Sequence, residues 1–472
     1  MLDAVIIGAG PNGLAAAITL AQRGLEVKVY EAKDTIGGGT RTQELTLPGF
    51  KHDVCSAIHP MAVASPFFQS LPLEEHGLQW IHPEYPLAHP LDNGEVVVLY
   101  ESLEKMVDSL GADGMKYHRL MEPIVQNWNS LSKQILGPIS LLPSSPIIMA
   151  RFGLQAFKSA ERLALNKFDN KETQALFAGL AAHSILPLSK PTTAAIGLVL
   201  GAVAHHIGWP FPKGGSHSIT KAMASYFKSL GGEIETNRLI TSIDELPKAK
   251  AIFFNTTPAQ VLDIAGDSVP YSYAHKLNGF RYGSGAFKLD LALEEPVPWI
   301  NPSCHKAATI HLGGTFEEIA QSEKAVANGK HPGKPYVLVA QQSLFDETRA
   351  PKGKHTIWAY CHVPHGSTKD MRKPILNQIE RFAPGFKDLI IGQHSMNTQD
   401  LQNYNANYIG GDINGGAQDL SQLFSRPVNM FNPYHIPQTN MYISSSSTPP
   451  GGGVHGMCGY HAAQSAIKDL FS

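Results

Sequence analysis

Apolar and polar residues near the start of the chain follow the pattern of a strand, a helix and a second strand. Residues 4–7 are a short apolar, β-branched run, typical of a strand buried on both faces of a parallel sheet. Residues 14–23 then show helical periodicity, and Gly24 is suited to end that helix. Residues 26–30 alternate again and lead to Glu31. The pattern predicts a βαβ unit.

This rhythm stops after residue 75. Residues 101–200 read mainly as helices interrupted by proline and glycine, which predicts a helical insertion. A second α/β segment follows the insertion. It predicts a helix over residues 219–230, edge strands over residues 233–236 and 239–243, and a buried strand over residues 251–255.

Strand patterns return in the second half of the chain. Residues 286–293 and 336–340 are strand-like, and we expect them to form a second sheet that lines a substrate cavity. Residues 441–445 read as a strand, residues 449–453 as a loop of proline and glycine, and residues 456–471 as a helix.

Length and composition narrow the classes of function. A chain of 472 residues exceeds what one hydrophobic core usually serves, so two or more structural regions are expected. A net charge of −2 gives no basic face for nucleic acid. The four cysteines form no C-x-x-C pair, which argues against a thiol redox centre and a zinc site. No apolar run is long enough to span a membrane, and we expect no leader peptide before the first strand.

The turn between the first strand and the first helix carries a dinucleotide-binding motif. Gly8 permits a tight turn, Gly10 lets the backbone approach a diphosphate, and Gly13 allows close packing of helix and strand. Pro11 and Asn12 complete the turn at the helix N-terminus, where free N–H groups favour negative charge. Glu31 ends the second strand, at the place expected for the acid that binds ribose hydroxyls. This order of elements predicts a site for an ADP group.

The stretch after Glu31 selects FAD over NAD. Ala32 is followed by a glycine-rich run that resembles the G-G-x-x-R-[ST] stretch of flavin amine oxidases and carotenoid desaturases. Its predicted cofactor-binding residues are Gly38, Gly39, Thr40, Arg41 and Thr42. The resemblance implies that the glycines run beside the diphosphate and flavin and that Arg41 supplies charge near the phosphates. The alternative for Arg41 is a solvated loop arginine.

A second glycine-rich turn is predicted to hold the flavin end of the cofactor. A strand-to-helix turn can place backbone N–H groups against an anion or a flavin edge. The predicted contacts here are Gly452, Gly453, Val454 and Gly456.

Motifs along the whole chain resemble the phytoene desaturase-related FAD-dependent oxidoreductases, in the branch typified by pyridine nucleotide-disulfide oxidoreductase domain-containing protein 2. They occupy residues 8–13, 37–42, 212–216, 345–351, 380–386, 410–416 and 450–459. The resemblance implies FAD and an α/β fold, in which a Rossmann-like FAD-binding domain of the amine-oxidase and desaturase type is discontinuous in sequence. The expected domains are an FAD-binding domain (residues 1–75, 205–275 and 425–472) and a mixed α+β substrate-binding region (residues 76–204 and 276–424). A cytoplasmic protein is expected, with peripheral contact at the inner membrane face left open.

Few catalytic side chains are expected, because the flavin performs hydride chemistry itself. The favoured candidates are His455, inside the second glycine loop, and Lys288, on a strand. The alternatives are a structural histidine and a surface lysine. Weaker candidates are His183, His205, His206, Trp209 and Tyr434. No metal site is predicted, since adjacent His205 and His206 point apart and no spaced third ligand is evident. The apolar residues 135–143 and 146–150 are candidates for a tunnel wall or a lipid-facing surface, against ordinary core packing.

Three functions follow from these residues and the resemblance. The first is desaturation of a small apolar substrate, isoprenoid or lipid-like, by hydride transfer to FAD. The second is redox-neutral cis–trans isomerisation of a polyene assisted by reduced flavin. The third is a regulatory or scaffold protein that FAD stabilises without turnover. The oligomeric state and the electron acceptor do not follow from the sequence.

Overall fold

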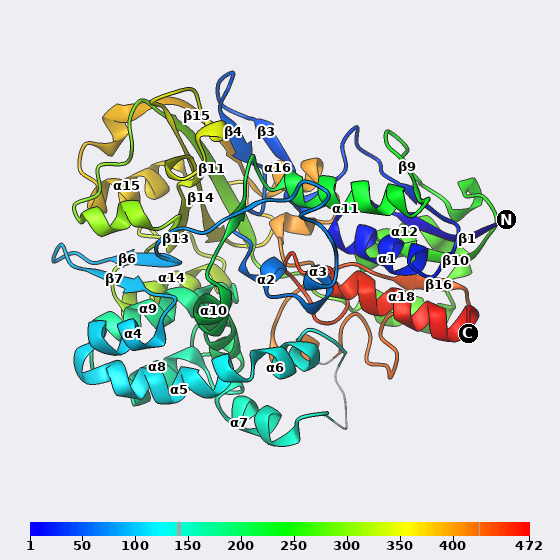
Figure 1. The fold of residues 1–472 in the computed structure, drawn as a ribbon, viewed down its shortest axis with the longest axis horizontal. Coiled ribbons are helices and arrows are strands. Elements are labelled where there is room, and N and C mark those ends of the chain that lie inside the picture. Colours follow the sequence, from blue (N-terminus) through cyan, green and yellow to red (C-terminus); the bar gives the residue numbers. More distant parts are fainter. Residues whose placement is uncertain (139–142, 424) are drawn as a thin grey trace.

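A computed structural model describes residues 1–138, 143–423 and 425–472. It contains a cofactor-side sheet, which carries both chain termini, and a second sheet with a layer of helices beneath it (Figure 1). Part of the apolar stretch expected at residues 135–143 lies outside the described residues. Among the described helices, none is both long and apolar enough to cross a membrane.

The cofactor-side sheet has five parallel strands in the order β16-β10-β1-β2-β9. Their bounds are β1 Leu2–Ile7, β2 Val27–Tyr30, β9 Glu233–Glu235, β10 Ala249–Phe254 and β16 Met441–Ile443. Strands that lie far apart in the sequence are therefore neighbours, and the predicted Rossmann-like α/β arrangement is confirmed. The order places the end of β1 between the ends of β10 and β2.

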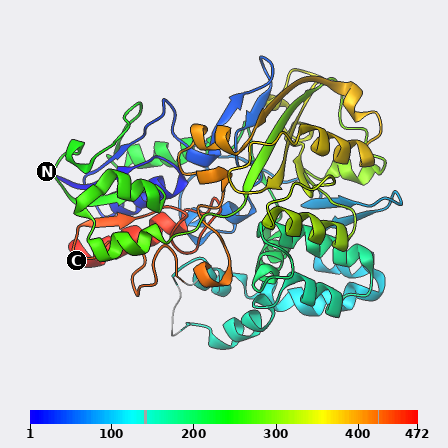
Figure 2. The ribbon, with the colours of Figure 1, turned by 180° about the vertical axis from the view of Figure 1, so that it is seen from behind.

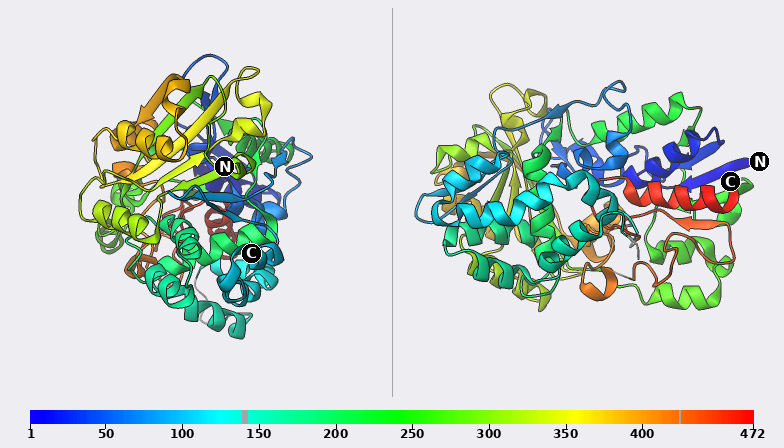
Figure 3. Two further views of the ribbon diagram at one scale, coloured as in Figure 1. Left: turned by 90° about the vertical axis from the view of Figure 1, so that its left-hand side faces the viewer. Right: turned by 60° about the horizontal axis from the view of Figure 1, so that its bottom comes forward.

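Helices cover both faces of this sheet. Ala4 and Ile6 of β1 face α1 (Pro11–Ala21), α11 (His217–Ser229) and α18 (Met457–Leu470). Figure 3 shows α18, in red, beside the N-terminal unit. Val5 and Ile7 face α12 (Pro258–Ala265) and α13 (Tyr271–Asn278), which lie toward the viewer in Figure 2. Burial on both faces explains the continuous apolar run of β1.

The second sheet has seven strands in the order β15-β11-β14-β13-β12-β6-β7. Their bounds are β6 Leu87–Pro90, β7 Val96–Leu99, β11 Gly285–Leu293, β12 Thr309–Leu312, β13 Val337–Ala340, β14 His355–Val363 and β15 Ile390–Met396. The strands expected near residues 286–293 and 336–340 are present. The hairpin β6–β7 was not predicted, and it precedes the helices expected over residues 101–200. It joins the sheet through a parallel pairing of Ala88 with Ile310.

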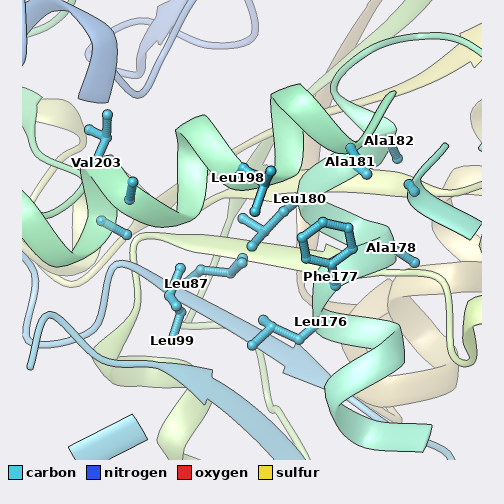
Figure 4. Close-up of a cluster of buried hydrophobic side chains, with 14 of the residues drawn as sticks. Leu87, Leu99, Leu176, Phe177, Ala178, Leu180, Ala181, Ala182, Leu198 and Val203 are labelled. Atoms are coloured by element: carbon cyan, nitrogen blue, oxygen red, sulfur yellow. The ribbon is translucent and has the colours of Figure 1, made fainter. Parts of the chain in front are cut away.

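The helices predicted between residues 101 and 200 form a layer under this sheet. They are α4 Leu103–Ser109, α5 Gly114–Gln126, α6 Trp128–Ile135, α7 Pro146–Ala156, α8 Ala160–Lys167, α9 Lys171–Ala182 and α10 Thr193–Ile207. The hairpin β6–β7 packs against this layer, where Leu87 and Leu99 meet Leu176 and Leu180 of α9 (Figure 4). Burial of these side chains holds the helical layer against the sheet.

The remaining α-helices and strands connect these layers or pack on them. They are α2 Pro60–Val63, α3 Pro66–Gln69, α14 Phe316–Ala327, α15 Arg372–Phe382, α16 Thr398–Tyr404, α17 Leu420–Leu423, β3 Thr42–Glu44, β4 Lys51–Asp53, β5 Trp80–Ile81 and β8 Phe211–Pro212. Among them, β3 pairs with β4 and β5 pairs with β8.

The prediction of an edge strand over residues 239–243 is wrong. Leu239 is 63% exposed, and a short 3-10 helix begins at Ile243. The carboxylate of Glu245 accepts hydrogen bonds from the backbone N–H groups of Thr241 and Ser242. These backbone groups are therefore satisfied by a local capping box rather than by a neighbouring strand.

Candidate active site

A cavity of about 730 Å³ extends from the glycine turns of the cofactor-side sheet to the helical layer. On the sheet side, residues predicted to bind the cofactor line it. These are Gly10, Pro11, Asn12, Gly38, Gly39, Gly452, Gly453 and Val454. On the other side, the wall is formed by α7, α10 and the second sheet, through residues such as Phe152, Val199 and Leu338. One space therefore joins the dinucleotide motif to apolar walls.

The first glycine turn is shaped to hold a diphosphate. Gly8 has φ +100°, which an L side chain rarely adopts, and a Cβ on Gly13 would lie 2.0 Å from the Gly8 carbonyl oxygen. No side chain caps the start of α1 at Gly10, so the first N–H groups of the helix remain available at the cavity. The buried Oδ1 atom of Asn12 has no hydrogen-bond partner. Open donors and an unfilled acceptor at a cradle without side chains fit a bound dinucleotide.

Glu31 lies at the end of β2, beside this turn. Its carboxylate accepts hydrogen bonds from the N–H groups of Ala9 (2.9 Å) and Lys33 (3.0 Å) and from Nη2 of Arg41 (3.1 Å). Arg41 is buried and also donates to the Thr35 carbonyl oxygen (2.7 Å). Arg41 is thus not a solvated loop arginine, and its charge is shared with the carboxylate predicted to bind ribose.

Four other residues predicted to bind the cofactor, Ala32, Thr40, Thr42 and Gly456, do not line the cavity. Thr40 donates to the Gly37 carbonyl oxygen, and Thr42 donates to Asp53. Gly456 caps the start of α18 with φ +71°, whereas Ala32 is exposed next to Glu31.

His455 lines the cavity, and both of its ring nitrogens form hydrogen bonds with backbone groups of its own loop. Nδ1 accepts a hydrogen bond from the N–H of Met457 (3.1 Å), so the proton is on Nε2, which donates to the Gly451 carbonyl oxygen (3.2 Å). Burial lowers the pKa of His455 to about 4. The neutral imidazole therefore braces the loop that carries Gly452 and Gly453.

Behind the same loop lies a buried arginine that the sequence did not single out. Arg426 is 1% exposed and donates from Nη2 to the carbonyl oxygens of Gly415 (3.1 Å) and Ser446 (2.9 Å). Its Nη1 has no partner and would lie 3.2 Å from a Cβ on Gly451. Burial lowers its pKa, but arginine stays charged in proteins. A positive charge bonded only to carbonyl groups thus stands behind the second glycine turn, where it favours negative charge on a ligand.

The alternative prediction for Lys288, a lysine on the surface, is wrong. Lys288 is 3% exposed on β11 and forms an ion pair with Asp290, which is fully buried. Its ammonium lies over the ring of Trp358, 5.9 Å from the ring centre, and Trp358 lines the cavity. Burial opposes the charge of Asp290, but Lys288 outweighs it and the pKa of Asp290 is lowered. Lys288 is therefore part of a buried charge pair next to the cavity.

The adjacent histidines on α10 have separate structural surroundings. His205 contacts the Tyr117 hydroxyl (2.8 Å) and the Glu101 carbonyl oxygen (3.1 Å), while His206 packs near Trp128. Within the described ranges, no group of His, Cys, Asp and Glu is arranged to hold a metal ion.

Buried histidines make the fold sensitive to acid. Burial lowers the pKa from the ordinary 6.5 to about 4 for His52, His59, His89, His205, His455 and His461. Between pH 6.5 and 4 the unfolded chain therefore binds protons that the folded chain rejects, and each such histidine removes about 1.4 kcal/mol of stability per pH unit. We expect a thermal unfolding midpoint that is constant above pH 7 and falls steadily below pH 6.5, measured by scanning calorimetry. A constant midpoint from pH 7 to 5 would contradict the neutral state of these histidines.

Sequence reasoning missed several residues that shape the cavity. Asn255 follows β10 and donates from its side chain to the Gly8 carbonyl oxygen (3.1 Å), while Trp358, Tyr360 and Tyr408 supply aromatic surface. Asn255 ends a predicted buried strand, so its position at the sheet edge was the available signal. No sequence signal pointed to the aromatic residues, because their position in the cavity depends on strand pairing.

Comparisons with known proteins agree with this geometry. Residues 6–71 match the family model of the NAD(P)-binding Rossmann-like domain. Pyridine nucleotide-disulfide oxidoreductase domain-containing protein 2 of Rattus norvegicus is 25% identical, covering 99% of this chain and 94% of the relative. A lycopene-forming phytoene desaturase of a Paracoccus species is 23% identical, covering 99% of this chain and 98% of the relative.

Solved structures share the fold. An oxidoreductase from Methanosarcina mazei has a TM-score of 0.67 at 16% identity and covers 99% of this chain and 100% of its own. A putrescine oxidase bound to putrescine has a TM-score of 0.62 at 17% identity, covering 100% of this chain and 99% of its own.

Proposed function

As a homologue of the phytoene desaturase-related oxidoreductases, the chain is an FAD-dependent oxidoreductase, and we propose that it transfers hydride from an apolar, isoprenoid or lipid-like substrate to the flavin. The observation that carries this substrate class is the cavity that joins the glycine turns to apolar walls. Among the described residues that line it, none is Asp, Glu, Lys or Arg. A charged substrate would lose its hydration there without gaining a partner.

The residues present fit FAD. We assign residues 1–75, 205–275 and 425–472 to the domain that binds it. The start of α1 would hold the diphosphate, Glu31 the ribose, and the turn at Gly452 and Gly453 the flavin end. When bound, FAD supplies a two-electron acceptor for a hydride.

The protein's own part in this reaction is to position the substrate and exclude water. Phe152, Val199 and Leu338 offer apolar contact to a hydrocarbon chain, and burial of a substrate among them displaces water from the reacting carbon. Arg426 stands behind the loop of Gly452 and Gly453, and its positive charge would favour negative charge on a cofactor held there. All four cysteines are free and three are buried, so a disulfide has no part in the proposal.

Anaerobic mixing with substrates tests the proposal. The FAD-loaded protein is mixed with isoprenoid alcohols, isoprenoid hydrocarbons or putrescine, and the visible flavin band is followed. We expect bleaching by an isoprenoid and none by putrescine, because the described lining of the cavity offers no carboxylate to an ammonium group. Product formation only with prereduced flavin would indicate that the protein catalyses isomerisation and not hydride transfer. A flavin inert to every lipid extract would favour the scaffold function, and bleaching by putrescine alone would overturn the apolar substrate.

A further inference from the structure

Three polar side chains stand together in the wall of the cavity. His183, Ser184 and Thr309 line it, next to apolar neighbours such as Leu186 and Leu338. Ser184 and Thr309 are 3% and 4% exposed, and neither hydroxyl has a hydrogen-bond partner among the residues that the structure describes. Leaving a buried hydroxyl without a partner is unfavourable. Two such groups beside a histidine in one wall indicate a site that a ligand completes.

The backbone is strained at two residues near this part of the wall. α9 ends at Ala182, so His183 and Ser184 lie in the turn that follows it, and Ile185 next to them has φ +54°. Thr192, which also lines the cavity, has φ +72°. Both are β-branched residues, for which positive φ is an outlier that strains the backbone. Strain of this kind is concentrated at functional sites.

His183 is held by a second histidine in the sheet. Its Nε2 lies 3.1 Å from Nε2 of His311, two residues after Thr309 on the same face of β12. Burial lowers the pKa of His183 to about 3 and that of His311 well below its ordinary value, so both rings are neutral. The contact therefore contains one N–H donor and one lone-pair acceptor.

The surroundings of Nδ1 of His311 decide which of the two rings donates in this contact. Nδ1 of His311 is buried and has no partner. An unused lone pair there costs less than an orphaned N–H, so His311 donates through Nε2. His183 then accepts at Nε2 and carries its proton on Nδ1. In the part of the chain that the structure describes, this Nδ1–H has no hydrogen-bond acceptor, and His183 thus offers a donor to a ligand.

We propose that His183, Ser184 and Thr309 form a subsite for a neutral oxygen function, a hydroxyl or a carbonyl, carried by the apolar substrate. This inference rests on the proposed function and narrows its substrate class to oxygenated isoprenoids or lipids, as opposed to pure hydrocarbons. One N–H donor and two hydroxyl groups, which donate or accept, match such an oxygen. A carboxylate or phosphate is disfavoured, because both histidines are neutral and none of the described residues that line the wall is Lys or Arg.

Binding of two matched probes to the FAD-loaded protein tests the subsite. Farnesol and farnesene share an isoprenoid chain and differ in one hydroxyl group, and their affinities are read from the perturbation of the flavin spectrum. We expect farnesol to bind roughly tenfold more tightly or better. Ser184→Ala with Thr309→Val should bring the ratio of affinities close to one and leave farnesene binding unchanged.

Thr173→Val is the matched control. Thr173 is 1% exposed on α9 and its hydroxyl also lacks a partner, but it does not line the cavity. It should leave the ratio unchanged. Thr173→Val and Thr309→Val should both raise the thermal midpoint, because each removes an unsatisfied hydroxyl, and this rise shows that the variants fold.

The possible results separate the subsite from the proposed reaction. Equal affinity of the two probes, or an equal loss for both in the double variant, would overturn the subsite. Bleaching of the flavin by both probes together with equal affinity would keep hydride transfer and reject the subsite. Selective farnesol binding that the double variant abolishes, without bleaching by any isoprenoid, would keep the subsite and reject hydride transfer.

Discussion

Gly459→Ala is expected to yield protein that retains no FAD after purification. Gly459 is the third residue of α18, where that helix crosses α1, and a Cβ there would lie 1.8 Å from the Asn12 carbonyl oxygen and 2.9 Å from the Ala16 nitrogen. Both are backbone atoms and cannot rotate away, so α18 has to move from α1. The glycine turns that line the cavity precede these two helices, and they separate with them. The ratio of flavin to protein absorbance measures the loss.

Gly153→Ala is the matched control for this variant. Gly153 lies inside α7, and a Cβ there would meet only the ring of Phe157 at 3.7 Å, which is ordinary contact. Alanine in a helix interior is more stable than glycine by roughly 0.5–1 kcal/mol. Gly153→Ala should therefore retain FAD with an unchanged or higher thermal midpoint. Full FAD content in Gly459→Ala would show that the crossing of α1 and α18 tolerates a methyl group.

Arg349→Met is expected to destabilise the fold by about 3–5 kcal/mol. Arg349 is 1% exposed and forms an ion pair with Asp53, which is fully buried on β4. Asp53 also accepts hydrogen bonds from the N–H of Ser216 (2.7 Å) and from Nε2 of Gln342 (3.1 Å), so the pair joins distant segments of the chain. Removing the guanidinium leaves a buried carboxylate without a counter-charge. A lower midpoint of urea unfolding would report the loss.

The pH dependence of this variant has a definite sign. In the native protein, burial opposes ionisation of Asp53, but Arg349 and the hydrogen bonds outweigh it and lower the pKa. That contribution is present above the unfolded pKa of 3.8 and is lost as the pH falls through the folded value. Without Arg349 the folded pKa rises, so acid protonates the carboxylate and relieves part of the damage. The difference between variant and native protein should shrink as the pH is lowered.

An exposed ion pair provides the comparison. Arg372 and Asp370 form an ion pair with side chains 45% and 53% exposed. Exposed pairs contribute about 0–1 kcal/mol, so Arg372→Met should change the unfolding midpoint little at any pH. Equal effects of Arg349→Met and Arg372→Met would mean that the buried pair with Asp53 carries no special share of the stability.

Sequence patterns predicted those parts of the molecule that depend on neighbouring residues. The βαβ unit, Glu31 at the end of β2 and the glycine turn before α18 are encoded in short segments, and they are present in the structure. The burial of Lys288 was not predictable, because it depends on the ion pair with Asp290 and on β14 and β15, which flank β11 and come from far along the chain. The wall at His183 likewise requires α9 to meet β12. Contacts between distant segments have no periodicity to reveal them.

The strand order of the cofactor-side sheet has a consequence for biosynthesis. β10 lies between β1 and β16, and α18 packs on α1, so the sheet holds both the earliest and the latest segments described. Ribosomes add about 5–20 residues per second, and many seconds therefore pass between the emergence of the first glycine turn and that of the last. During that interval the apolar edge of β10 and one side of α1 lack their partners. The nascent chain therefore keeps these surfaces exposed until the last segments emerge.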